Sequence, residues 1–262
     1  MATTAPLGQE ALNWTSFRVG GTRLDAVTTS QAIGALRHWV RTRDRASVAF
    51  CTASTVVEAN SDAHLAGALE ETDLVTADGM PLVWLGRRRS AAALERVYGP
   101  DFMVDVMQAT GSSMRHFFYG GAPGVAEEMA RRLQGRFSDL EVAGVLSPEL
   151  VNGTSIAHDD VARINAANPD IVWVGLGHPK QEKWMRTHRQ VLDAPVLAGV
   201  GAAFDFLSGR KQEAPAWMKR SGLQWLHRLL AEPHRLWRRY LIGNVRFVLL
   251  VASCFGSDRA AA

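Results

Sequence analysis

The 262-residue sequence has few cysteines and no long apolar run, and each absence excludes a class of protein. Its two cysteines, Cys51 and Cys254, lie far apart without metal-ligand spacing, which argues against a disulfide framework or a zinc site and favours a reducing, cytoplasmic setting. No uninterrupted apolar segment approaches the roughly 20 residues that a membrane-spanning helix needs. The first residues also lack the basic start and apolar core of a secretory signal.

Charge is distributed unevenly along the chain. Residues 209–246 contain nine lysines and arginines against two glutamates, a net charge of +7. Asp258 and Arg259 cancel, so the total of +3 leaves −4 for residues 1–208. An acidic body with a basic tail indicates a polyanionic partner, which is a membrane surface, a nucleic acid or a phosphorylated ligand.

Strand and helix patterns alternate through the body, after a short hairpin region in residues 1–30. The strands are predicted at 47–52, 74–76, 115–119, 141–146, 170–174 and 194–199, and the helices at 31–43, 55–71, 102–109, 125–134 and 159–167. This alternation predicts an α/β fold with a Rossmann-like, doubly wound, mostly parallel sheet. The predicted domains are a catalytic domain of residues 1–208 and a basic helical C-terminal appendage of residues 209–262.

The segment LVTADGMPLVW places Asp78 directly after an apolar strand and before a turn. Parallel strands end at the same edge of a sheet, so Asp78 and Thr52, which follows the preceding strand, are expected to lie together where α/β proteins bind ligands. Two interpretations of Asp78 stay open. It caps the next helix through its side chain, or it carries chemistry.

Further candidates follow other predicted strands. Arg96 is either a surface charge or a bidentate ligand for a phosphate or sugar. The turn with Gly120, Gly121 and Gly124 leads from a strand into a helix, which suits a phosphate cradle or simply tight packing. The remaining candidates are a close-approach turn at Gly175 and Gly177, the helix start at Lys180 and Gln181, and Asp205, which is placed to meet a ribose or base.

The tail interleaves tryptophans with arginines from Ala214 onward. One interpretation is a helical pair packed on the sheet with solvated arginines. The other is an interfacial surface whose aromatic residues enter the headgroup layer of a membrane.

Six segments of the chain together resemble a known family. They are LVTADGMPLVW, RVYGPDFM, FFYGGAPGVAE, DIVWVGLGHPKQEKWM, GVGAAFDFLSG and APAWMKRSGLQWLHRLLAEPHRLWRRY. In this order they resemble the signatures of the WecG/TagA/CpsF glycosyltransferases (glycosyltransferase family 26), over roughly residues 20 to 250.

The resemblance implies inverting transfer of a sugar, of the N-acetylmannosamine type, a uronic acid or a hexose, from a UDP-sugar to a polyprenyl-diphosphate-linked saccharide. Such reactions build teichoic acids and other bacterial surface polysaccharides at the cytoplasmic membrane face, so a peripheral location there is expected. Asp78 matches the family's general base, Arg96 its R-V-x-G arginine and Gln181 the glutamine of its P-K-Q-E motif. The resemblance also implies that the appendage folds over the site, where three of its arginines reach the donor diphosphate: Arg228, Arg235 and Arg238.

The chain departs from the family at one motif. Where the family reads T-x-N, this sequence has Phe50-Cys51-Thr52, so Thr52 takes the asparagine position, which leaves the donor sugar open. No D-x-D motif is present, and arginines bind a diphosphate without a carboxylate cage, so the sequence requires no metal or other cofactor. The oligomeric state also stays open, with a homo-oligomer among the options.

Two rival functions fit parts of the sequence. A nucleic-acid-binding module accounts for the basic tail but gives the Asp78 edge no role. An NAD-dependent oxidoreductase fits the sheet but lacks the glycine fingerprint after the first strand. We therefore expect no nucleic acid among the partners.

Overall fold

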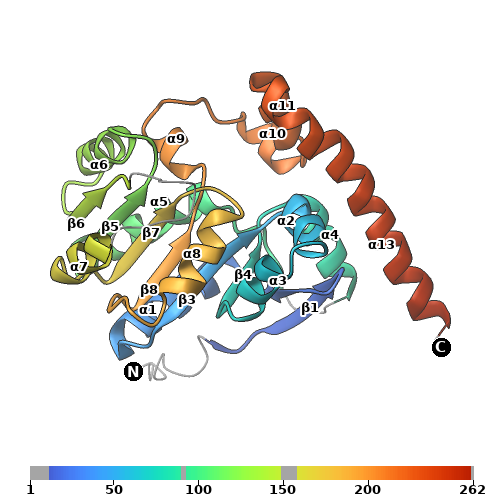
Figure 1. The fold of residues 1–262 in the computed structure, drawn as a ribbon, viewed down its shortest axis with the longest axis horizontal. Coiled ribbons are helices and arrows are strands. Elements are labelled where there is room, and N and C mark those ends of the chain that lie inside the picture. Colours follow the sequence, from blue (N-terminus) through green and yellow to red (C-terminus); the bar gives the residue numbers. More distant parts are fainter. Residues whose placement is uncertain (1–11, 90–92, 149–157, 261–262) are drawn as a thin grey trace, which may run out of the picture.

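A six-stranded parallel sheet forms the centre of the computed structural model, which describes residues 12–89, 93–148 and 158–260 (Figure 1). The strands lie in the order β4-β3-β8-β7-β5-β6, and a separate antiparallel hairpin joins β1 to β2. The strands are β1 Thr15–Val19, β2 Thr22–Ala26, β3 Ala46–Cys51, β4 Leu74–Ala77, β5 Arg115–Gly120, β6 Glu141–Leu146, β7 Ile171–Gly175 and β8 Val196–Gly199.

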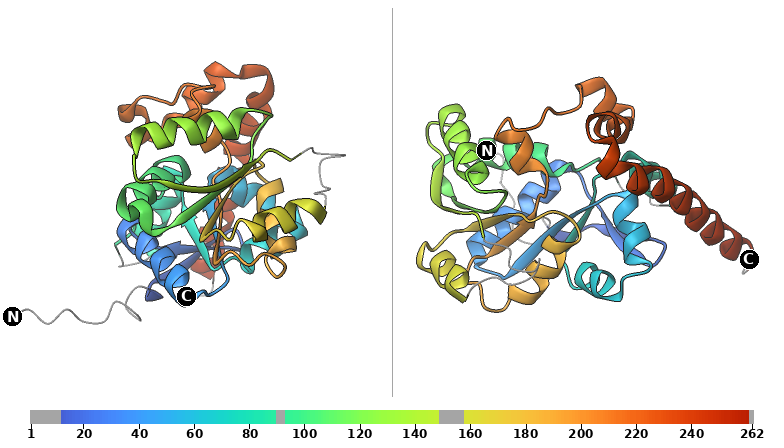
Figure 2. Two further views of the ribbon diagram at one scale, coloured as in Figure 1. Left: turned by 90° about the vertical axis from the view of Figure 1, so that its left-hand side faces the viewer. Right: turned by 45° about the horizontal axis from the view of Figure 1, so that its top comes forward.

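Helices cover both faces of the sheet, which confirms the Rossmann-like, doubly wound fold (Figure 2). The helices of the body are α1 Thr29–Thr42, α2 Ala53–Ala59, α3 Ala63–Glu70, α4 Met80–Arg89, α5 Gly99–Thr110, α6 Val125–Arg136, α7 His158–Ala166, α8 Lys180–His188 and α9 Ala203–Leu207, with a 3-10 turn η2 at Gly111–Ser113.

Alternating side chains along each strand decide which helices pack on which face. In β3, Val48 and Phe50 join a core cluster with α1, α5, α6 and α9. Ala49 and Cys51 point the other way, into a cluster with α2, α3 and α4, and β7 faces α7 and α8 in the same manner. Since β3 is buried along its whole length, five of its six residues are apolar and polar residues do not alternate with them.

The single helix predicted at 55–71 is wrong, because the segment forms two helices, α2 and α3. The chain turns at Asn60 and Ser61, and the Asp62 carboxylate then accepts hydrogen bonds from the backbone N–H groups of His64 and Leu65, at 3.0 and 3.1 Å. Such an N-cap satisfies donors that would otherwise be left without partners, and so favours a new helix start at this point.

The appendage is helical and returns to the body after leaving the sheet. Its elements are α10 Ala216–Arg220, α11 Gln224–Ala231, α12 Pro233–Trp237, a π-helical turn η3 Arg238–Ile242 and α13 Gly243–Ala260. The long helix α13 lies along α2, where Phe247 is buried and Leu250 packs against the β1–β2 turn at Gly20 (Figure 1). Among the described residues, no helix combines the length and the apolar character required to span a bilayer.

Candidate active site

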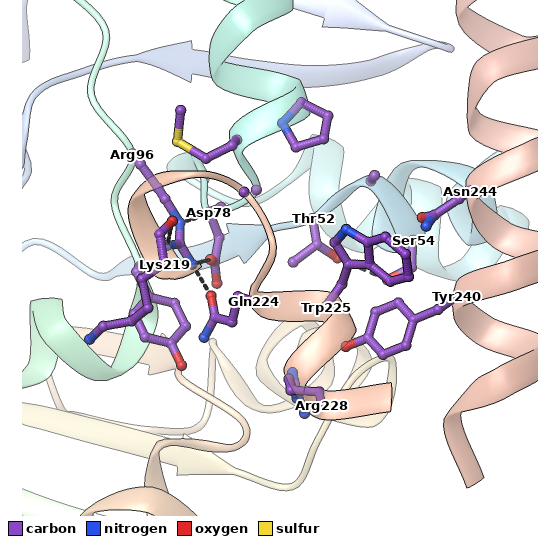
Figure 3. Close-up of a pocket in the computed structure, with 16 residues that line it drawn as sticks. Thr52, Ser54, Asp78, Arg96, Lys219, Gln224, Trp225, Arg228, Tyr240 and Asn244 are labelled. Atoms are coloured by element: carbon purple, nitrogen blue, oxygen red, sulfur yellow. Dashed lines mark hydrogen bonds and ion pairs between the residues drawn. The ribbon is translucent and has the colours of Figure 1, made fainter. Parts of the chain in front are cut away.

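Asp78 and Thr52 lie side by side at the carboxyl ends of β4 and β3, as the sequence predicted. The parallel register pairs Cys51 with Ala77, and the Asp78 N–H donates to the Cys51 carbonyl at 2.9 Å. Thr52 is the N-cap of α2, where its hydroxyl accepts from the Thr55 N–H at 3.3 Å. Asp78 is therefore held by a backbone hydrogen bond to β3 and Thr52 by the capping of α2, and both side chains line one pocket (Figure 3).

Arg96 forms a largely buried ion pair with Asp78 and is not a surface charge. One guanidinium nitrogen of Arg96 lies 3.2 Å from the Asp78 carboxylate, and Nε donates to the Asp78 carbonyl. The two side chains are only 15% and 14% exposed. The same guanidinium also reaches the appendage, where it donates to the Lys219 carbonyl at 3.1 Å and to the Gln224 side chain (Figure 3). Arg96 thus joins the acid of the body to α10 and to the start of α11.

Burial raises the pKa of Asp78 above the ordinary aspartate value of 3.8, although several groups act against this shift. The positive charges of Arg96 and Arg228 and a hydrogen bond from the Gly99 N–H favour the carboxylate and lower the pKa in part. A carboxylate of raised pKa binds a proton more readily than an exposed aspartate does, which suits it to general-base catalysis.

The appendage supplies the opposite wall of this pocket. Trp225 and Arg228 of α11 face Asp78 across the cavity, together with Tyr240 of η3 and Asn244 of α13 (Figure 3). The rings of Trp225 and Tyr240 pack with centroids 6.0 Å apart, so the wall is an ordered cluster. The pocket consequently exists only between the body and the appendage.

Sequence reasoning missed many residues of this pocket. The pocket residues that it did not single out include Ser54, Tyr98, Lys219, Gln224, Trp225, Tyr240 and Asn244. Tyr98 adjoins the R-V-x-G arginine, and burial raises the pKa of its hydroxyl, which stays protonated. The aromatic residues of α11 and η3 carry no local signal, because the same pattern is typical of any helix packed on a body.

Comparison with known proteins identifies the family. A family model described as "Glycosyl transferase WecG/TagA/CpsF family" matches residues 17–259. The chain belongs to this glycosyltransferase family. Two similar proteins each bear the name N-acetylglucosaminyldiphosphoundecaprenol N-acetyl-beta-D-mannosaminyltransferase. The protein of Bacillus subtilis is 28% identical over 206 residues, 78% of either chain, and that of Bacillus spizizenii is 31% identical over 185 residues, 70% of either chain.

The glycine-rich turns of this glycosyltransferase lie outside the Asp78 pocket. Gly120 has a φ of 130°, and a Cβ there would lie 2.6 Å from the Gly175 carbonyl carbon. A Cβ on Gly175 would lie 2.5 Å from the Phe204 ring, which also approaches Gly121. These three glycines therefore allow close packing at the ends of β5 and β7. Gly124 and Gly177 also have positive φ but stand in open space. The predicted contacts of all five glycines with a substrate stay predictions.

The other candidates of the same half make contacts within the protein or lie exposed, and their predicted contacts with a substrate stay predictions. Gln181 is buried, and its amide donates to the Gly199 carbonyl at 2.6 Å, which ties α8 to the end of β8. Lys180 at the start of α8 is exposed. Asp205 pairs with Lys211 at 2.8 Å, and Lys211 also pairs with Glu232 at 3.1 Å. These ion pairs connect α9 and the end of α11 through Lys211 at the start of the appendage.

The three appendage arginines do not lie on one continuous helix. The helix breaks between α11 and α12, where Glu232 has φ −136° and ψ 62° ahead of Pro233. Arg228 lines the Asp78 pocket, whereas Arg238 lines a neighbouring groove. The backbone of Arg235 lies in α12, and its side chain is outside the described part of the structure. The spacing of the three arginines along the sequence therefore does not by itself place them on one helix face, and their contact with the donor diphosphate stays a prediction.

Proposed function

We propose that this glycosyltransferase moves a sugar of the N-acetylmannosamine type from a UDP-sugar to a polyprenyl-diphosphate-linked saccharide, with inversion at the anomeric carbon. An acceptor hydroxyl oxygen attacks the anomeric carbon, the bond from that carbon to UDP breaks, and the hydroxyl proton passes to the Asp78 carboxylate. UDP leaves with the bonding electron pair. No covalent intermediate with the enzyme forms.

The observation that carries this proposal is the pocket shared by Asp78 and Arg228. A base must take the acceptor proton, and positive charge must stabilise the departing diphosphate, so both groups have to face the same space. Asp78 has a raised pKa and a fixed backbone, and Arg228 stands on the facing wall of the pocket. The names of the two similar bacterial proteins support the choice of sugar and of a lipid-diphosphate acceptor.

Arginine takes the place of a divalent metal in this proposal. The guanidinium of Arg228 offers a forked set of donors that matches phosphate oxygens, and its charge is retained at any physiological pH. We therefore expect turnover to persist when EDTA replaces added magnesium. Activity that disappears in EDTA and returns with magnesium would contradict this expectation.

The acceptor fixes where the reaction takes place. A polyprenyl diphosphate resides in a membrane, so we propose that the enzyme works on the cytoplasmic membrane surface with its appendage facing the lipid. The appendage exposes large apolar side chains that support this orientation, among them Trp217 at 59%, Trp237 at 43% and Leu241 at 53%.

The decisive experiment is mass spectrometry of the product made from a panel of UDP-sugars and a polyprenyl-diphosphate-linked N-acetylglucosamine. We expect one added N-acetylhexosamine with UDP-N-acetylmannosamine and little product with the glucose or uronic acid donors. Preferred transfer of a uronic acid or a hexose would overturn the choice of sugar and would direct attention to Thr52, where the chain departs from the family motif. Family membership favours neither the nucleic-acid-binding nor the NAD-dependent alternative.

A further inference from the structure

A second groove adjoins the Asp78 pocket and shares Ser54 with it. Its walls come from α2, from the turn between β7 and α8, and from the junction of η3 with α13. Ser54 is hydrogen-bonded to Thr52, with 2.9 Å between the two hydroxyl oxygens. Thr52 lines the pocket but not the groove, so the hydroxyls of Thr52 and Ser54 lie between Asp78 and the groove.

Two arginines give this groove its charge. Arg238 and Arg246 both line it, from η3 and from the first turn of α13. Within the part of the chain that the structure describes, neither arginine is paired with a carboxylate. Both side chains are exposed, and Arg238 stacks on the neighbouring Trp237 ring, 5.2 Å from its centroid. Two guanidinium groups on one wall are the side chains best suited to phosphate oxygens.

One acid also faces the groove and reduces its charge without cancelling it. Glu58 of α2 lies 3.1 Å from Nε2 of His178, whose Nδ1 lies 3.2 Å from the buried carboxylate of Glu182. The Glu58 carboxylate is therefore directed at the imidazole of the opposite wall. The two arginines outweigh its single charge, so the groove keeps a net positive charge.

An apolar surface begins where the charged part of the groove ends. Ile242 lies in the groove wall, and the helix beyond it exposes Val245 and Leu249 at 60% and 64%. Leu241, Val245 and Leu249 recur every four residues, so they form one stripe along the outer side of the helix. From the catalytic pocket outward, the surface therefore presents the Asp78 carboxylate, then the hydroxyls of Thr52 and Ser54, then the guanidinium groups of Arg238 and Arg246, and finally the apolar stripe.

We propose that this groove binds the diphosphate of the polyprenyl-linked acceptor, with Arg238 and Arg246 as its ligands and the prenyl chain leaving over Ile242. The inference rests on the proposed function, and it assigns the arginines of the appendage to two different substrates. Arg228 serves the donor in the catalytic pocket, whereas Arg238, which the family resemblance assigns to the donor diphosphate, serves the acceptor. The acceptor saccharide then extends from the groove past Ser54 and Thr52, with its hydroxyl at Asp78.

Steady-state kinetics with the full chain tests this division. We expect Arg238→Gln and Arg246→Gln each to raise KM for the lipid-diphosphate acceptor about tenfold, the scale of one lost charge-assisted contact, and to leave KM for the UDP-sugar unchanged. Arg210→Gln is the matched control, because Arg210 is exposed, belongs to the same basic segment and lies outside both cavities. It should change neither constant.

Other results would overturn the proposal. A rise in KM for the donor would return Arg238 to the donor site. Unchanged KM values with weaker flotation on phosphatidylglycerol vesicles would make the arginines anchors for lipid headgroups in general. Equal effects in Arg210→Gln would reduce the result to the loss of net charge.

A binding measurement separates failure of the groove from failure of the proposed function. Farnesyl diphosphate is titrated into the protein by calorimetry while saturating UDP occupies the donor pocket. We expect binding that weakens about tenfold in the Arg238→Gln and Arg246→Gln variants but not in Arg210→Gln. This result would support the groove even if no UDP-sugar of the panel were turned over. Equal affinity in all four proteins would refute the groove even if the transferase reaction were demonstrated.

Discussion

The carboxyl edge of the sheet is built differently in its two halves. At the ends of β3 and β4 the chain continues with Thr52 and Asp78, whose side chains face a cavity. β5 and β7 instead end in Gly120 and Gly175; a Cβ on Gly120 would meet the Gly175 backbone, and a Cβ on Gly175 would meet the Phe204 ring. Both halves have the strand-turn-helix form that is typical of ligand sites. The difference teaches that the same strand-turn-helix form allows tight packing in one half and places polar side chains in a cavity in the other.

The largest effect is expected in the polar half. Asp78→Asn keeps the size of the side chain but removes the base, so kcat should fall about 100-fold or more while UDP affinity and folding are retained. Product formation, calorimetry with UDP and circular dichroism measure these three properties. Near wild-type turnover would show that the base lies elsewhere and would remove the functional contrast between the two halves.

The pH dependence of the wild-type enzyme is a second test of Asp78 as the general base. Because burial raises the pKa of Asp78, the carboxylate is protonated at a higher pH than an exposed aspartate. The base is active only when it is deprotonated, so kcat/KM should rise with pH through this pKa, with a midpoint above 3.8, and level off beyond it. A pH–rate profile gives the midpoint, and the residual rate of Asp78→Asn should lack this limb. A midpoint at or below 3.8 would contradict the role of burial.

In the half that contains β5 and β7, glycine substitutions should change the stability of the protein and not its turnover. Gly120→Ala places a Cβ 2.6 Å from the Gly175 backbone at a φ of 130°, so the free energy of unfolding should fall by about 3 kcal/mol. Gly124→Ala is the matched control, because its φ of 80° is strained but its Cβ would meet no atom within 4 Å. It should cost about 1 kcal/mol. Urea unfolding measures both changes, and equal costs would show that close packing is not what selects glycine at position 120.

The division between the halves was only partly predictable from the sequence. The strand patterns and the rule for parallel strands placed Thr52 beside Asp78 correctly. The glycine turn at Gly120 was ambiguous, because tight packing and a phosphate cradle use the same residue type for the same backbone freedom. What decided the matter was the backbone of Gly175, which lies against Gly120 because β5 pairs with β7, more than 50 positions away along the chain.

The appendage was the least predictable part of the site. Its charge and its helices follow from composition and spacing, but the break at Glu232 and Pro233 redirects the chain, so Arg228 and Arg238 reach different cavities. The helix start at Asp62 was missed for another reason. Its capping signal is present in the sequence, but the apolar pattern continues across it.

The link between the body and the appendage should give a smaller effect than loss of the base. Gln224→Ala removes a hydrogen-bond acceptor of Arg96, which leaves the guanidinium less firmly held on Asp78. We expect kcat to fall about fivefold with little change in either KM, on the scale of one hydrogen bond of about 1 kcal/mol. Gln212→Ala serves as the control, because Gln212 is an exposed glutamine of the same segment that does not line the Asp78 pocket. Equal rates in the two variants would show that Arg96 is positioned by the body alone.

The smallest effect is expected at the exposed end of the packed half. Lys180 begins α8 at the carboxyl edge, and this position at a helix start made it a candidate for substrate binding. It is exposed and lines neither the Asp78 pocket nor the groove beside it. Lys180→Ala should therefore change kcat and both KM values less than twofold, because an exposed charge without a fixed partner contributes well under 1 kcal/mol. The measurement is the same two-substrate kinetic series. A tenfold rise in KM for the UDP-sugar would place the donor phosphates over α8, and the two halves of the edge would then form one extended substrate site.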